Sequence, residues 1–123
     1  MADEVVTVTI VMNAQNAIAI SVDKEPVNLV NVGTNEGVQW VIDQNSVGWT
    51  FTKDNSGDSN GIDIKGAGNK FKDKKSGSPP HKKHKWERKI KDGNWYRYTI
   101  SVTNETVANP ATKLTWDPSI MNN

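Results

Sequence analysis

The sequence of 123 residues contains no cysteine, and this absence removes several kinds of chemistry from consideration. Without thiolates there is no disulfide, no thiol nucleophile, no iron–sulfur cluster and no cysteine-bound zinc, and a type 1 copper centre lacks its thiolate ligand. Long apolar runs are also missing, because none approaches the roughly 18 residues that a membrane-spanning helix needs. We therefore expect no membrane insertion, and the length suits a single domain.

Motifs of the common enzyme classes are absent as well. The sequence has no nucleophile elbow, no glycine-rich phosphate loop, no paired-carboxylate motif and no zinc-hydrolase helix. We therefore predict a protein that is not an enzyme and that carries no cofactor. The segment Met1–Glu4 has neither the basic nor the apolar region of a signal peptide, which favours a cytoplasmic location. A processed periplasmic form would have the same sequence.

Short alternations of apolar and polar residues, the pattern of β-strands, run through the whole chain. They are separated by turn-forming Gly, Asn, Asp and Pro, and no helical period of any length interrupts them. We expect strands over residues 4–12, 18–22, 27–32, 38–42, 47–51, 62–64, 85–91, 95–103 and 112–116. The residues expected to line the inner faces of the fourth and fifth strands are Val38, Trp40, Ile42, Val47, Trp49 and Phe51, and one face of the strand at 95–103 carries Tyr96, Tyr98, Ile100 and Val102. This series of strands predicts one all-β domain over residues 1–123, an antiparallel sandwich or barrel.

Three connections have distinctive compositions. Residues 66–84 are rich in Gly, Lys, Ser and Pro, with Phe71 as an isolated aromatic residue, and they predict a long basic loop. Asp92–Gly93 lies between two strand patterns and predicts a tight hairpin turn. Asp54–Asp63 has alternate oxygen ligands, as calcium loops do, but lacks the closing Glu of an EF-hand. The same residues are those that an ordinary hairpin turn prefers.

Several segments together resemble the cupredoxin family. They are Ile18–Val22, Pro26–Gly33, Gly37–Asp43, Asp92–Tyr98 and Trp116–Ile120. A proline-led strand followed by a glycine turn, and a glycine followed by alternating aromatics, carry the likeness. The last segment is similar to small bacterial cupredoxin-like proteins of uncharacterised function. The order and spacing of the segments imply an antiparallel Greek-key β-sandwich of the cupredoxin-like kind, with an immunoglobulin-like sandwich as the alternative topology.

The copper ligands of that family are missing from the matching positions. Cupredoxins carry a ligating His just after the strand that ends here near Asp43, where this chain has Val47-Gly48-Trp49. Their remaining ligands, Cys, His and usually Met, lie between the last two strands, and residues 99–116 contain none of these. The resemblance therefore implies the fold without a type 1 copper site, and we do not expect electron transfer.

Charge is unevenly distributed along the chain. Residues 1–64 have two lysines and nine acidic residues, a net charge of −7, whereas residues 65–97 have twelve basic and three acidic residues, a net charge of +9. This asymmetry predicts either ion pairs within the fold or a local site for anions. The candidate residues for binding a polyanion or another partner are Lys72, Lys74, Lys75, Lys82, Lys83, Lys85, Arg88, Lys89 and Trp86. Cations follow phosphates and Trp86 could stack on a base, whereas the simpler interpretation places Trp86 in the core.

His81 and His84 are the only histidines and form a His-x-x-His motif. Neutral imidazole is a common ligand of copper, nickel and zinc ions. Lysines flank both residues, however, and the one carboxylate near them along the chain, Glu87, does not complete a ligand set. We therefore expect solvent-exposed loop histidines and keep a metal site at His81 and His84 as a minor alternative.

These observations predict a non-enzymatic, copper-free, cupredoxin-like binding or assembly module. Its expected partner is another protein or a second copy of the chain, docked on the basic residues 65–97. A first alternative is binding of a polyanion such as a nucleic acid by the same residues, which would weaken steeply with salt. A second alternative is metal handling through His81 and His84.

Overall fold

The computed structural model describes residues 3–12, 14–15, 17–75, 79–104, 106 and 112–123. In this part of the chain, no helix is long and apolar enough to cross a membrane. The strands found there are β1 (Glu4–Met12), β2 (Ile18–Val22), β3 (Val27–Asn28), β4 (Gly37–Ile42), β5 (Trp49–Phe51), β6 (Ile62–Ile64), β7 (Phe71–Asp73), β8 (Lys83–Arg88), β9 (Trp95–Asn104), β10 (Thr112–Trp116) and β11 (Ser119–Met121).

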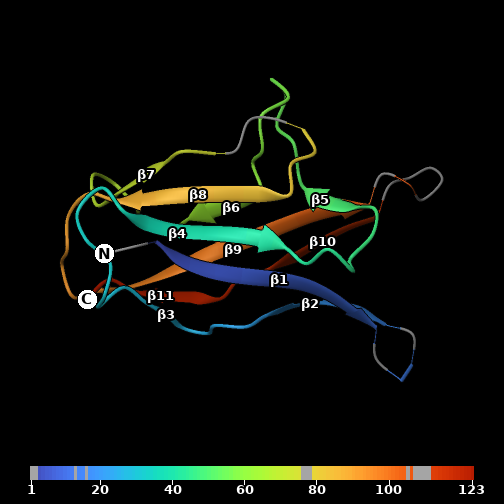
Figure 1. The fold of residues 1–123 in the computed structure, drawn as a ribbon, viewed down its shortest axis with the longest axis horizontal. Coiled ribbons are helices and arrows are strands. Elements are labelled where there is room, and N and C mark those ends of the chain that lie inside the picture. Colours follow the sequence, from blue (N-terminus) through green and yellow to red (C-terminus); the bar gives the residue numbers. More distant parts are fainter. Residues whose placement is uncertain (1–2, 13, 16, 76–78, 105, 107–111) are drawn as a thin grey trace.

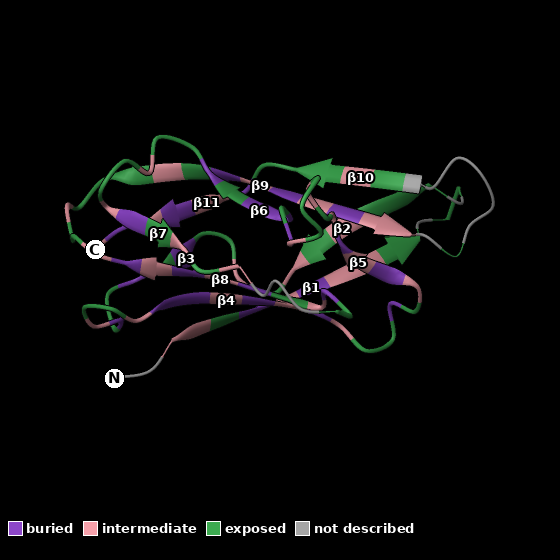
Figure 2. Cartoon of the chain, turned by 90° about the horizontal axis from the view of Figure 1, so that it is seen from above, coloured by how far each residue is buried: buried purple, intermediate pink, exposed green. Residues whose placement is uncertain are grey.

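The strands form two sheets that lie in two layers, so the all-β sandwich prediction is confirmed (Figures 1 and 2). The first sheet has the order β2–β1–β4–β8–β7. The second is built around β9, with the order β10–β9–β11–β3, and β5 and β6 also pair with β9. The prediction of purely antiparallel pairing is wrong at two places, because β1 pairs with β4 and β3 pairs with β11 in parallel.

The core lies between the sheets and follows from the alternation in the sequence. On β4 the residues Val38, Trp40 and Ile42 are buried, as predicted, and β9 buries every second residue from Tyr98 to Val102. The rings of Trp40 and Tyr98 meet across the layers with centroids 5.0 Å apart. Each large apolar side chain buried in this way contributes about 1.5–3 kcal/mol, which favours this packing of the two faces.

Two predicted connections differ from those observed. The predicted basic loop at 66–84 contains β7 and the first residues of β8, and its residues 76–78 lie outside the described residues. The predicted tight hairpin turn at Asp92–Gly93 is wrong, because β8 belongs to the first sheet and β9 belongs to the second. Residues 89–94 instead form an irregular connection between the layers, in which Gly93 has a φ of 73°.

Strand limits also depart from the prediction in a few places. The expected strand at 27–32 is reduced to β3, because the Val32 N–H turns back to the carbonyl of Leu29. Val47, expected to face inward in phase with Trp49, is 79% exposed and precedes β5. The strand β11 was not predicted, and it follows the buried Pro118.

Candidate functional site

The basic segment, residues 65–97, is largely built into the sandwich. It supplies β7, β8 and the start of β9. Along β8 the side chains of His84, Trp86 and Arg88 are buried, and the residues between them are more exposed. The segment therefore contributes both to the core and to the outer surface of the first sheet.

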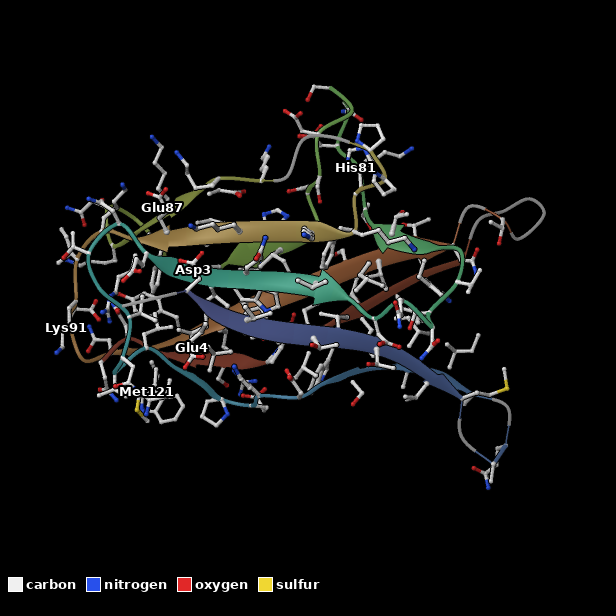
Figure 3. The ribbon with its side chains drawn as sticks, viewed as in Figure 1. Asp3, Glu4, His81, Glu87, Lys91 and Met121 are labelled. Atoms are coloured by element: carbon white, nitrogen blue, oxygen red, sulfur yellow. The ribbon has the colours of Figure 1, made fainter. Side chains whose placement is uncertain are left out.

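Four of the candidate lysines form ion pairs inside the molecule. Lys75 Nζ lies 3.1 Å from Asp54 Oδ2, and Lys85 Nζ lies 2.9 Å from Asp3 Oδ2. Lys74 and Lys89 both approach the carboxylate of Glu87, at 3.7 and 2.8 Å. Figure 3 shows Asp3 and Glu87 beside β4 and β8. Two of these pairs join the basic segment to the acidic first half, which is the pairing that the charge distribution suggested.

Two of the acidic partners, Asp3 and Asp54, have lowered pKa values. The pKa of Asp54 is lowered from 3.8 to about 2 by a hydrogen bond from the Ser56 hydroxyl and then by Lys75. At Asp3, partial burial opposes ionisation, but the ammonium of Lys85 and the N–H of Gly37 outweigh it and lower the pKa. Both carboxylates are therefore ionised at neutral pH and neutralise their lysines. The Asp54 oxygens are thus engaged in a turn and an ion pair, as the simpler interpretation of that stretch expected.

Few of the candidate cations remain for an external anion. Lys72 and Lys83 are exposed and form no ion pair with any described residue. Lys82 donates from Nζ to the carbonyl of Trp49 at 2.7 Å. The carbonyl does not neutralise this ammonium, so three candidate lysines keep a charge without an ion pair to a described residue. Because affinity for a polyanion grows with the number of phosphates neutralised, three such lysines give a weak electrostatic site.

Arg88 and Trp86 are internal residues and not surface contacts. Arg88 is 5% exposed and donates to the side chain of Asn122 and to the carbonyls of Val32 and Asn123. Burial lowers its pKa from the usual value. Trp86 is 8% exposed, and its Nε1 donates to the Ile62 carbonyl at 2.9 Å, which links β8 to β6 in the other sheet. The prediction that these two side chains meet a partner is inconsistent with this burial.

The expectation that His84 is exposed is wrong. Its side chain is fully buried, with Nδ1 3.2 Å from the Ser59 hydroxyl and Nε2 2.8 Å from Asp73 Oδ1. Because the carboxylate accepts at Nε2, a neutral imidazole places its proton there and accepts the Ser59 hydroxyl at Nδ1. Asp73 lies eleven residues away in sequence but is brought close by the pairing of β7 with β8. We call Ser59, His84 and Asp73 the histidine relay.

His81 is also buried, at 5% exposure, and not in a solvated loop. It has a φ of 58°, and its carbonyl accepts the N–H of Phe51 at 2.8 Å. Its Nδ1 is buried and has no hydrogen-bond partner among the residues that the structure describes. The residue therefore anchors the entry to β8 against β5 (Figure 3).

The arrangement of the two histidines does not make a metal site. Both ring nitrogens of His84 are occupied by the relay. Among the described residues, no group of three or more His, Cys, Asp and Glu side chains is placed to hold a metal ion. The relay contains the residue types of a hydrolase triad, but Ser59 is 0% exposed, so its hydroxyl cannot reach a substrate. The relay has a structural role, because its two hydrogen bonds connect the turn before β6 with β7 and β8.

An apolar concavity that the sequence did not reveal lies at one end of the sandwich. Its volume is about 250 Å³, and it is lined by Ile10, Val11, Met12, Ile18, Asn45, Ser46, Val47 and Trp49. We call it the apolar mouth. Val47 and Met12 on its rim are 79% and 64% exposed. The Ser46 hydroxyl accepts the Ile10 N–H at 3.0 Å and so joins the loop after β4 to β1.

The sequence of this chain matches no protein-family model and none of the curated proteins with which it was compared.

Proposed function

We propose that the protein is a non-catalytic binding module that receives an apolar side chain of a protein partner in the apolar mouth. The observation that carries this proposal is the exposure of three aliphatic or thioether side chains around one concavity, Met12, Ile18 and Val47. Apolar side chains that stay in water around a concave site are typical of interaction surfaces. Anchor residues of protein interfaces fill such pockets and supply much of the binding free energy.

The size of the mouth favours a side chain over a cofactor. Pockets that enclose small-molecule ligands usually have volumes of about 300–1,000 Å³. The mouth, at about 250 Å³, is smaller and is open at its rim. Its polar residues are Asn45 and Ser46, and the Ser46 hydroxyl already accepts a backbone N–H. A partner therefore gains mainly by burying apolar surface, which is worth roughly 25 cal/mol per Å².

We further propose that the sandwich is a copper-free relative of the cupredoxins in topology. The resemblance places the absent copper-ligating His near residues 47–49, and two of these, Val47 and Trp49, line the mouth. In this interpretation an apolar pocket occupies the place of the family's metal site. The Greek-key connectivity and the cytoplasmic location that we expected from the sequence belong to the same proposal.

The polyanion alternative has less support. Four of the candidate lysines are neutralised within the molecule, and Arg88 and Trp86 are buried. Binding through the apolar mouth predicts an affinity that changes little with ionic strength, whereas a polyanion site predicts a steep loss. A second copy of the chain would satisfy the same apolar surface, and the oligomeric state of the pure protein distinguishes this case.

Peptides selected from a displayed random library on the wild-type protein provide the test. Their affinity is then measured by fluorescence anisotropy for wild type, Val47→Asp and the control Val30→Asp, at low and high salt. Val30 is 56% exposed and is not part of the mouth, so Val30→Asp adds the same charge at another exposed valine outside the proposed site. We expect Val47→Asp to weaken binding at least about tenfold and Val30→Asp to leave it unchanged. Equal affinities of the two variants, or a steep loss with salt, would contradict the proposal.

A further inference from the structure

The outer face of the second sheet carries an array of hydroxyl groups. On β9 the residues that alternate with the buried Tyr98, Ile100 and Val102 point away from the core. The register of β5 and β10 places further outward side chains beside them, with Thr50 opposite Thr103 and Thr115 opposite Ser101. We call the resulting set the hydroxyl face, and its members are Thr50, Thr52, Thr99, Ser101, Thr103 and Thr115.

These hydroxyls are regularly spaced and only partly used within the protein. Neighbouring strands lie about 4.8 Å apart, and alternate residues along one strand about 6.8 Å apart, so the hydroxyls form short rows in two directions. Thr52 and Thr103 share a hydrogen bond at 2.9 Å, and Thr99 donates to Asp117 at 2.7 Å. Ser101 and Thr115 have no side-chain hydrogen bond to a described residue. Since a hydroxyl can donate once and accept twice, the face keeps both kinds of capacity.

An exposed aromatic ring ends the same row. Trp95 has the outward phase of β9 and is 58% exposed, the largest exposed aromatic surface among the described residues. Its cross-strand neighbour is Met121, which Figure 3 shows at the end of the molecule away from the β1–β2 connection. An indole and a thioether therefore share the outer surface with the hydroxyls, and the exposed Arg97 lies between Trp95 and Thr99 on β9.

Charge on this surface is nearly balanced. Asp63 and Lys65 form an ion pair at 2.6 Å, and the Arg97 guanidinium donates to the carbonyl of Asp117 at 3.1 Å. Together with the exposed Lys113, this surface has three basic residues and two acidic residues, Asp63 and Asp117. A polyanion needs a larger surplus of cations, and a protein interface of standard kind needs a more apolar centre. A neutral, hydroxyl-rich ligand is complementary to both the charge and the hydrogen-bonding groups.

We propose that the hydroxyl face and Trp95 bind a neutral polysaccharide lying along β9. Sugar rings have an apolar face of C–H groups, which packs on an indole, and a rim of hydroxyls that donate and accept as Ser and Thr do. The row from Trp95 to Thr103 spans about 27 Å of extended strand, long enough for several sugar units to contact it at once. Many weak contacts along a chain then add to a useful affinity. This site is separate from the apolar mouth and does not depend on it.

Affinity gel electrophoresis tests the proposal with defined probes. The native protein is run in gels that contain hydroxyethylcellulose, soluble xylan or barley β-glucan, with heparin as a charged comparison. We expect at least one neutral polysaccharide to retard wild type and Val47→Asp equally. Trp95→Ala should lose at least about tenfold in affinity, and Trp95→Phe should keep most of it. Trp116→Ala is the matched control, because Trp116 is 39% exposed but lies opposite the buried Ile100 and not on the hydroxyl face.

A second variant addresses the hydroxyls without removing the aromatic ring. Ser101→Val and Thr115→Val keep the β propensity of their strands, so circular dichroism should be unchanged. Together they should weaken polysaccharide binding at least about tenfold. The proposal is overturned if no neutral polysaccharide retards the protein, if only heparin does, or if Trp95→Ala and the double valine variant behave as Trp116→Ala does.

Discussion

Removing the acceptor of the histidine relay is expected to destabilise the sandwich strongly. In Asp73→Ala the Nε2–H of the fully buried His84 loses its partner, and an unsatisfied buried donor costs about 1–3 kcal/mol. The same carboxylate accepts the backbone N–H of Lys75 at 3.0 Å, and losing that bond adds about 0.5–1.5 kcal/mol. The free energy of unfolding should therefore fall by about 2–4 kcal/mol. At a urea m-value of about 2 kcal/mol/M, the midpoint shifts down by roughly 1–2 M.

The isosteric variant Asp73→Asn separates the hydrogen bond from the charge. Its carboxamide oxygen still accepts from His84 Nε2–H and from the Lys75 N–H, so we expect a loss below about 1 kcal/mol. Ser59→Ala, at the opposite ring nitrogen, removes the hydroxyl that donates to Nδ1 and should cost about 1–3 kcal/mol. Urea unfolding followed by tryptophan fluorescence measures all three variants. Equal midpoints for Asp73→Ala and Asp73→Asn would refute the reasoning, since the relay would then contribute no specific hydrogen bond.

Three further perturbations follow from the same structure. Gly61→Ala should cost at least about 1–3 kcal/mol in urea unfolding, because the new Cβ would lie 2.4 Å from the Cβ of Phe51. Gly57→Ala meets no atom within 4 Å, so only its backbone strain at a φ of 91° contributes, and an effect as large as that of Gly61→Ala would contradict the packing argument. The pKa of Asp54 is lowered from 3.8 to about 2 in the folded protein, so its carboxylate stabilises the fold above pH 3.8, and this contribution is lost as the pH falls through about 2. Asp54→Asn lacks the contribution, so its free energy of unfolding should fall less than that of wild type over this pH window. Arg88→Met leaves buried carbonyls without their donor and should cost about 1–3 kcal/mol, whereas a surface role would predict no change in the melting temperature.

The strand pattern carried most of the information about which residues face the core. The limits of β1 and β2 follow directly from alternation, and three of the four residues on the predicted apolar face of β9, Tyr98, Ile100 and Val102, are buried. Alternation says which side of a strand is buried, but it does not say which strand lies next to it. The parallel pairing of β1 with β4 depends on a crossing between layers, and for that reason local sequence could not reveal it.

The candidate site was harder to predict, for reasons that are local and physical. Val47 is in phase with Trp49, but Gly48 between them has a φ of 84°, which breaks the alternation and turns Val47 outward. His84 looked solvated because β7 is only three residues long and sits in a lysine-rich stretch. Once β7 pairs with β8, Asp73 lies opposite Trp86, and its carboxylate reaches the imidazole. The opposite net charges of residues 1–64 and 65–97 were the one signal that pointed to the ion pairs.

The central position of β9 has a consequence for how the protein is made. Its residues pair with β5, β6, β10 and β11, and β3 joins the second sheet only through β11. A ribosome that has synthesised β3, β5 and β6 has therefore produced three strands whose partners do not yet exist. These edges stay open to solvent until residues 95–121 emerge, which is the interval in which non-native strand pairing competes. The need for chaperones during synthesis should therefore depend more on how late β9 is synthesised than on the free energy of unfolding of the finished protein.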